Sequence, residues 1–143
     1  YLKEISRDNA RTPMQWDDSE NAGFTNGTPW IKVNPNYTEI NAKAAITEPD
    51  SVFHYYQELI HLRHTLPIIV YGKFQGLLED SETIYAYNRL LDGQVLTVAC
   101  NFTSHEQDCT LCDDTSAKEL ISNYKTHIAG KLQPYEARVI LHQ

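Results

Sequence analysis

The chain has 143 residues, of which 41% are hydrophobic and 22% are charged, a composition typical of a folded globular domain. Asp and Glu outnumber Lys and Arg by 19 to 12, giving a formal net charge of −7, which argues against nucleic acid and anionic membranes as partners. The chain is shorter than the roughly 250 residues of a complete (β/α)₈ barrel, and no apolar run approaches the roughly 20 residues that a membrane span needs.

The start of the chain and its cysteines bear on whether it is part of a longer protein and on its cellular compartment. Tyr1 is the first residue and no apolar signal sequence follows it, so we expect a piece of a longer protein. The three cysteines, Cys100, Cys109 and Cys112, are odd in number and lack the spacing of a disulfide framework. A reducing compartment fits them better than secretion, and we predict a cytoplasmic protein.

Residues 6–38 are rich in Asn, Asp, Gly and Pro, so regular secondary structure is not expected there. The aromatic residues Trp16, Phe24, Trp30 and Tyr37 recur through this segment. We therefore expect it to pack down as an ordered loop rather than to act as a flexible linker.

Residues 51–66 form the one predicted helix. Apolar residues recur at i, i+4, i+7 and i+8 from Val52 onward, which is the spacing of one helical face. Asp50 or Ser51 can cap the start of this helix, and Pro67 stops it because the residue before a proline avoids the helical region.

Beyond Pro67 the pattern changes to strands. Residues 83–89 alternate in polarity, residues 94–102 are more continuously apolar, and Asp92 and Gly93 between them favour a hairpin turn. Further strands are predicted at 73–79, 107–112, 118–124 and 135–142. The chain is therefore expected to be mainly β, with an antiparallel β-sandwich at 68–143 preceded by a loop-rich and helical part at 1–67.

Two motifs could hold a metal or a reactive thiol. Cys109 and Cys112 form a CxxC pair, but no second ligand pair follows, and in a strand positions i and i+3 face opposite sides. Buried, inert cysteines are the interpretation this favours over a redox or zinc module. The three histidines of the predicted helix, His54, His61 and His64, lack the i, i+4 spacing of zinc helices and are assigned to a polar face.

Charged residues near the start of the chain are the other candidates. Asp17, Asp18 and Glu20 lie too close in sequence to form the separated carboxylate pair of a glycosidase, so a solvated acidic turn is favoured. Arg7 and Arg11 are the only cations in residues 5–31. Their guanidinium groups suit a carboxylate or sugar hydroxyls, and from the residues alone both a sugar pocket and a salt bridge that holds the loop remain open.

The run RDNARTPMQW at residues 7–16, together with residues 21–25 and 29–37, resembles the α-glucosidases of glycoside hydrolase family 13. The resemblance is to the oligo-1,6-glucosidase and dextran glucosidase (glucan 1,6-α-glucosidase) branch and covers essentially the whole chain. The predicted helix resembles the last helix of the family's catalytic barrel, and residues 132–139 resemble the closing strand of its C-terminal β-domain.

This resemblance implies the C-terminal part of a retaining exo-acting enzyme that hydrolyses α-1,6-glucosidic bonds of isomalto-oligosaccharides or dextran. The family's three catalytic carboxylates lie upstream of the matching region, so the chain alone is expected to be inactive and to need the remainder of the barrel as its partner. The resemblance assigns binding of the terminal glucose to Arg7, with Arg11 as second choice. No catalytic residue, cofactor or metal is expected in this chain.

Other functions remain open at this point. Trehalose-6-phosphate hydrolases share the arginine segment but differ at residues 32–37, and sucrose isomerases are a further neighbour. A non-catalytic carbohydrate-binding β-module would need an exposed aromatic platform. The candidate rings for it, most of them attributed to core packing, are Tyr71, Phe74, Tyr85, Tyr87, Tyr124 and Tyr135.

Overall fold

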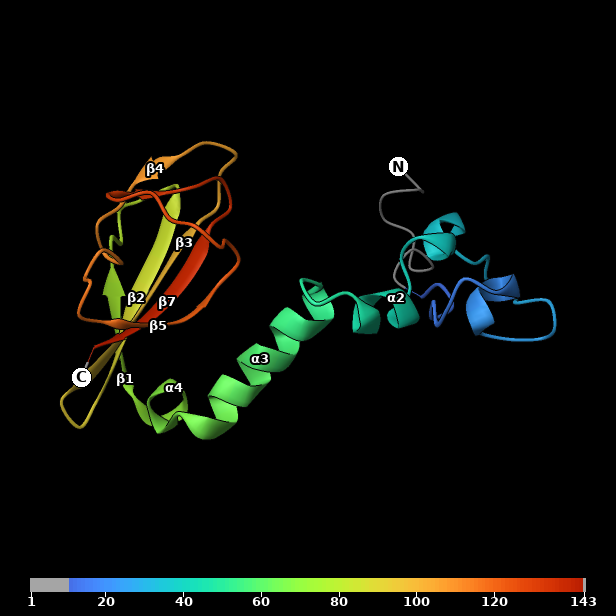
Figure 1. Cartoon of the computed structure of the whole chain (residues 1–143), viewed down its shortest axis with the longest axis horizontal. Helices are drawn as coiled ribbons and strands as arrows, with labels where there is room; N and C mark the ends of the chain where they lie inside the picture. Colours follow the sequence, from blue (N-terminus) through green and yellow to red (C-terminus); the bar gives the residue numbers. More distant parts are fainter. Residues whose placement is uncertain (1–10, 143) are drawn as a thin grey trace. The chain divides into compact units, whose positions relative to one another are not determined.

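A computed structural model describes residues 11–142 of the chain. The chain divides between Tyr56 and Gln57 into two compact units (Figure 1). The division falls inside helix α3, Val52–Thr65, ahead of the domain boundary predicted at Pro67, which stays a prediction. No helix in the described range is both long enough and apolar enough to cross a membrane.

From residue 11 to the start of α3, the first unit is a loop interrupted by short helices. They are η2 (Glu20–Gly23), η3 (Pro35–Thr38) and α2 (Ala42–Thr47), of which the sequence analysis predicted none. Asn41 caps α2, since its side chain accepts a 2.8 Å hydrogen bond from Ala44 N, which satisfies one free amide of the first turn.

Helix α3 is present where the sequence predicts it, ending before Pro67. Pro67 does not end the helical region, however, because it also begins a short second helix, α4 (Pro67–Tyr71). Proline favours a first helical position because its missing N–H needs no partner there. Only Leu62 of α3 is buried, so the predicted apolar face, which includes Val52 and Ile60, is uncovered among the described residues.

The second unit contains a five-stranded antiparallel sheet with the strand order β1-β2-β3-β7-β5 and a two-stranded sheet of β4 and β6 (Figure 1). Asp92 and Gly93 join β2 to β3 with φ values of 50° and 84°, as a two-residue hairpin turn requires. The strands are β1 (Lys73–Leu77), β2 (Ile84–Leu91), β3 (Gln94–Asn101), β4 (Gln107–Asp108), β5 (Lys118–Ser122), β6 (Lys131–Leu132) and β7 (Ala137–His142).

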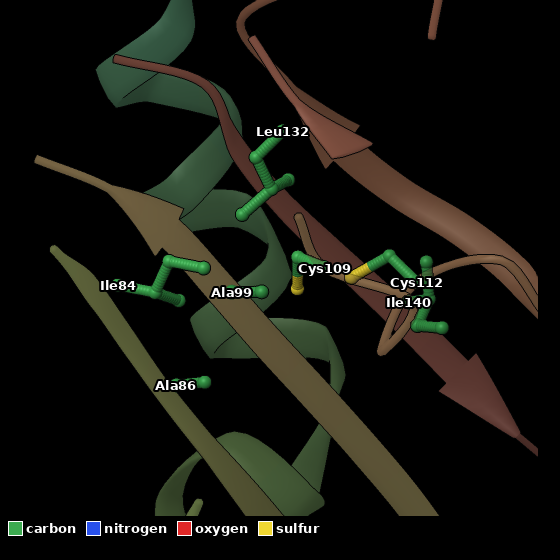
Figure 2. Packing of buried hydrophobic residues seen from close by; sticks show 7 residues of the cluster. All are labelled: Ile84, Ala86, Ala99, Cys109, Cys112, Leu132 and Ile140. Carbon is green, nitrogen blue, oxygen red and sulfur yellow. The ribbon is translucent and has the colours of Figure 1, made fainter. Parts of the chain in front are cut away.

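Both faces of the larger sheet carry apolar side chains. On one face Ile84, Ala99 and Ile140 pack against Cys109, Cys112, Leu132 and their neighbours (Figure 2). On the other face Leu96, Val98 and Leu141 pack against Ile68 of α4. The predicted β-sandwich is therefore confirmed, since a second layer covers the sheet on the side of the cysteines.

One predicted strand is wrong in extent. The segment predicted as a strand at 107–112 pairs only at Gln107 and Asp108, and a turn follows in which Asp113 N donates to Thr110 O at 3.2 Å. Because Cys109 directly precedes this turn and Cys112 lies within it, the alternation of a strand does not apply to them. Both enter the same apolar cluster (Figure 2).

A buried ionic network ties the end of the chain to the sheet. Glu136 is fully buried; its two carboxylate oxygens lie 2.7 Å from His127 Nδ1 and 2.7 Å from Gln133 N. Glu119 lies on the other side of the same histidine, 3.2 Å from Nε2, and 3.1 Å from Arg138 Nη2. A buried carboxylate keeps its charge only with such partners, so the network fixes the approach to β7.

This network predicts a large loss of stability when Glu136 is neutralised. We expect Glu136→Gln to lower the free energy of unfolding by about 3 kcal/mol, because His127, 2.7 Å from Glu136 Oε1, and Arg138, whose Nε lies 3.9 Å from the same oxygen, lose their buried charged partner. Glu106→Gln is the matched control, since Glu106 forms an exposed 2.8 Å ion pair with Lys131 and such pairs add little. Urea unfolding followed by circular dichroism measures the free energy of unfolding of both variants. Equal losses in the two variants would contradict a stabilising role for the buried Glu136.

Candidate functional site

The candidate site lies in the first unit, in the loop that begins with the arginine segment. Arg7, the first-choice substrate-binding residue, lies outside the described residues. Arg11, the second choice, is described, and its side chain is exposed to solvent. The structure therefore describes the loop that follows Arg11 and the contacts that hold it in place.

Helix α2 anchors the beginning of this loop. The backbone amides of Ala42 and Lys43 donate to the carbonyls of Gln15 and Trp16 at 2.9 and 3.0 Å, and these amides belong to the first helical turn, where no intrahelical acceptor exists. The side chain of Gln15 donates to Asn36 Oδ1 at 3.1 Å and also to the backbone carbonyl of Ile40. Three chain segments are thus held together around residues 15 and 16.

A left-handed turn follows. Asn21, Ala22 and Gly23 have φ values of 54°, 59° and 64°, although residues other than glycine lose about 1–2 kcal/mol each in this region. Ala22 is fully buried, and its carbonyl accepts hydrogen bonds from Trp16 N at 2.9 Å and Asp17 N at 3.3 Å. Backbone strain that tertiary contacts hold in place is a feature of functional loops.

Acidic side chains support this turn. Asp17 accepts hydrogen bonds from the hydroxyl of Ser19 and, at 2.9 Å, from Ser19 N, and these two bonds lower the pKa of its carboxyl. A Cβ atom on Gly23 would lie 2.7 Å from Asp17 Oδ1, so a side chain there would have to displace the Asp17 carboxylate. Asp18 forms a 3.6 Å ion pair with Lys43. These contacts agree with a structural acidic turn rather than a catalytic pair.

The aromatic side chains of the loop do not pack down as predicted. Trp16 is 53% exposed and Trp30 is 86% exposed, and Phe24 is exposed as well. Hydrogen bonds, and not burial of these rings, order the loop, so the expectation that aromatic packing orders it is wrong. Large exposed apolar groups on an ordered loop indicate a surface that another molecule or domain covers.

The remaining candidates of the sequence analysis do not form reactive sites. Burial raises the pKa of Cys109 and raises that of Cys112 to about 12, which leaves both as neutral thiols near pH 7. His54 Nε2 lies 2.9 Å from the carbonyl of Ile46. Among residues 11–142, no group of three or more His, Cys, Asp or Glu side chains could hold a metal ion.

The rings considered for a carbohydrate platform are scattered, with one exception. Tyr124 donates from its hydroxyl to Pro134 O at 2.8 Å, which is a structural bond. Phe74, Tyr87 and Tyr85 lie together on strands β1 and β2, with successive ring centroids 5.3 and 5.6 Å apart. The alternation of residues 83–89 already placed both tyrosines opposite the buried Ile84, but assigning most of the rings to core packing missed their exposure.

Known proteins resemble the chain over nearly its whole length. Residues 1–72, half of the chain, match the family model "Alpha amylase, catalytic domain". The oligo-1,6-glucosidase of Parageobacillus thermoglucosidasius is 55% identical over 141 residues, which cover 93% of this chain and 25% of that enzyme.

Solved structures show the same relationship. The trehalose-6-phosphate hydrolase of Bacillus licheniformis superposes with a TM-score of 0.89 and 44% identity, over 98% of this chain and 27% of that one. Isomaltulose synthase from Klebsiella sp. LX3 superposes with a TM-score of 0.86 and 42% identity. This match covers 96% of this chain and 26% of that one. The chain thus spans about a quarter of the length of these relatives.

The left-handed turn predicts that replacing Gly23 destabilises the first unit. Gly23→Ala should lower the free energy of unfolding of the first unit by about 2 kcal/mol, because the new Cβ meets Asp17 at a strained φ. Gly27→Ala is the control, since its Cβ would meet only Thr25 Oγ1 at 3.8 Å. Both tryptophans, Trp16 and Trp30, lie in this unit, so tryptophan fluorescence in urea reports it selectively. Equal free energies of unfolding for Gly23→Ala and Gly27→Ala would contradict a stabilising role for the left-handed turn.

Proposed function

This chain belongs to the α-amylase family of glycoside hydrolases, family 13, and we propose that it is the C-terminal part of a retaining exo-acting α-glucosidase. The enzyme cleaves α-1,6-glucosidic bonds of isomalto-oligosaccharides or dextran. The observation that carries this proposal is the arginine segment at residues 7–16 within a chain that is 55% identical to an oligo-1,6-glucosidase over 141 residues.

The linkage preference rests on two comparisons. The chain is more similar in sequence to the oligo-1,6-glucosidase than to the trehalose-6-phosphate hydrolase or the isomaltulose synthase. Residues 32–37, KVNPNY, also resemble the 1,6-glucosidases rather than the trehalose-6-phosphate hydrolases. Cleavage of trehalose 6-phosphate and isomerisation of sucrose are the alternatives that a substrate panel separates from isomaltose hydrolysis.

In this enzyme the reacting carboxylates come from the part of the protein outside this chain. Retaining glycosidases use one carboxylate as nucleophile and one carboxylic acid as proton donor, and water then resolves the covalent glycosyl-enzyme. Asp17, Asp18 and Glu20 are not assigned to these roles. The chain supplies a substrate-contacting loop and the β-sandwich domain, which carries out no chemistry.

Within the loop we assign the substrate contact to Arg7. A guanidinium offers a rigid set of donors to the hydroxyls of the terminal glucose and to a neighbouring carboxylate. Active sites of (β/α)₈ barrels are built from the loops that follow the strands, and this loop precedes α3, the proposed last barrel helix. The anchoring of residues 15 and 16 on α2 supports the role, because a binding arginine needs a rigid mounting.

The proposed compartment is the cytoplasm. Cys100, Cys109 and Cys112 are all free thiols, which accords with a reducing environment.

The assignment of Arg7 is tested in a chimera, namely the Parageobacillus thermoglucosidasius oligo-1,6-glucosidase with its matching quarter replaced by residues 1–143 of this chain. We expect Arg7→Ala to lower kcat/KM for isomaltose by about 10- to 100-fold, the cost of losing hydrogen bonds from a charged donor. The Tm should not change, since the lost contacts are to substrate.

Arg11→Ala is the matched control, and its kcat/KM for isomaltose should stay close to that of the unsubstituted chimera. A large loss from Arg11→Ala alone would move the role to Arg11. An unchanged kcat/KM in both variants would contradict a substrate contact by this segment.

A further inference from the structure

Asparagine precedes glycine at one place in the chain. Of the six glycines, only Gly27 follows an asparagine, Asn26. The pair lies between η2 and η3, where residues 24–34 form neither helix nor strand, and both of its residues are exposed to solvent. The pair therefore combines a chemically reactive sequence with an open position in the loop.

An asparagine can react with the backbone of the residue that follows it. The amide nitrogen of that residue loses its proton to hydroxide and attacks the side-chain Cγ atom. The N–Cγ bond forms and the Cγ–Nδ2 bond breaks, and ammonia leaves with a proton from water, which regenerates hydroxide. Water then opens the resulting five-membered succinimide at either carbonyl carbon. The products are aspartate and isoaspartate, and no enzyme, cofactor or oxidant is needed.

The backbone at Gly27 favours this attack. Glycine has no Cβ, so the chain at this position can bend toward the preceding side chain at little cost. A Cβ built on Gly27 would meet only Thr25 Oγ1, at 3.8 Å. The space around the attacking nitrogen is therefore open.

The contacts of the pair leave its reacting groups accessible. Among the described residues, the side chain of Asn26 has no hydrogen-bond partner. The amide of Gly27 donates to Thr25 Oγ1 at 3.1 Å. Because this exposed bond to a hydroxyl adds little net stability, it opens easily and releases the nitrogen.

We propose that Asn26 is a site of spontaneous deamidation in the folded chain, where a succinimide formed with Gly27 N opens to aspartate and isoaspartate. The proposal does not depend on the proposed function, because the reaction requires only these two residues and water.

Isoaspartate at this position disturbs the end of the left-handed turn. Asn21 Nδ2 donates to the carbonyls of Thr25 and Gly27 at 3.3 and 3.2 Å, and these carbonyls lie on either side of Asn26. Isoaspartate carries the backbone through its side-chain carbons, which lengthens the chain between the two carbonyls by one methylene. Asn21 then cannot keep both bonds in their present geometry, so deamidation limits the lifetime of the ordered loop.

The test incubates residues 1–143 at neutral and at mildly alkaline pH. Mass spectrometry of the digested chain follows the mass gained when an amide becomes a carboxylate, and chromatography separates the aspartate and isoaspartate peptides. We expect Asn26 to convert at least about 10-fold faster than Asn21 and Asn41 in the same samples, since both of these precede an alanine. The rate at Asn26 should rise with pH, because the attacking nitrogen has to lose its proton.

Gly27→Ala is the matched variant. The loop has room for the added Cβ, and φ at this position is outside the left-handed region, so the fold should be kept. The variant should slow conversion of Asn26 by about 10-fold or more, because alanine restricts the bend that the attack requires. Equal rates with and without this substitution would overturn the proposal.

The same incubation in guanidinium chloride separates the folded loop from the bare sequence. Asn26 in buffer should convert within about 10-fold of its rate in the unfolded chain. Asn41 should instead gain reactivity on unfolding, because its side chain donates to Tyr37 O at 2.9 Å and accepts from Ala44 N at 2.8 Å. Conversion of Asn26 in guanidinium chloride but not in buffer would mean that the fold protects the pair, and it would overturn the proposal.

Discussion

Apolar surface has to be covered, and the sheet of the second unit shows how far this chain meets that requirement with its own residues. One face is closed by Cys109, Cys112 and Leu132. The other is closed only where α4 packs on it, and a groove with exposed aromatic rings remains. In the first unit Trp16 and Trp30 are likewise exposed. The relatives that match the chain are about four times as long, and under the proposed function residues outside this chain would cover both surfaces.

Hydrogen bonds and ion pairs hold the segments in which few apolar side chains are buried. In the first unit, hydrogen bonds from α2 and the left-handed turn at Asn21 to Gly23 hold the loop although its aromatic rings face solvent. In the second unit, the fully buried Glu136 and its partners fix the entry to β7. The described part of the loop, residues 11–38, is therefore held by hydrogen bonds and not by burial of its rings.

The sequence predicted most of the strands because alternation and the Asp92–Gly93 turn are local signals. It missed α2, a helix of six residues whose only sequence signal is its N-cap, Asn41. It also missed β6, which has only two residues and so shows no alternation. It extended β4 through the cysteines because a buried turn and a short strand are equally apolar. The left-handed turn was not predicted, since it depends on hydrogen bonds of Asn21 and Ala22 with residues four to six positions away, which residue propensities do not show. Arg7 and Arg11 were singled out by charge and aromatic neighbours, but their roles came from the family resemblance.

The central claim is that the chain contributes a substrate loop and a β-domain to an enzyme whose catalytic carboxylates lie elsewhere. Glucose release from isomaltose, measured for residues 1–143 alone beside the chimera with the oligo-1,6-glucosidase, tests it most directly. The account predicts release by the chimera and none by the chain alone. Release by the chain alone would mean that it carries its own catalytic carboxylates, and that would contradict the account.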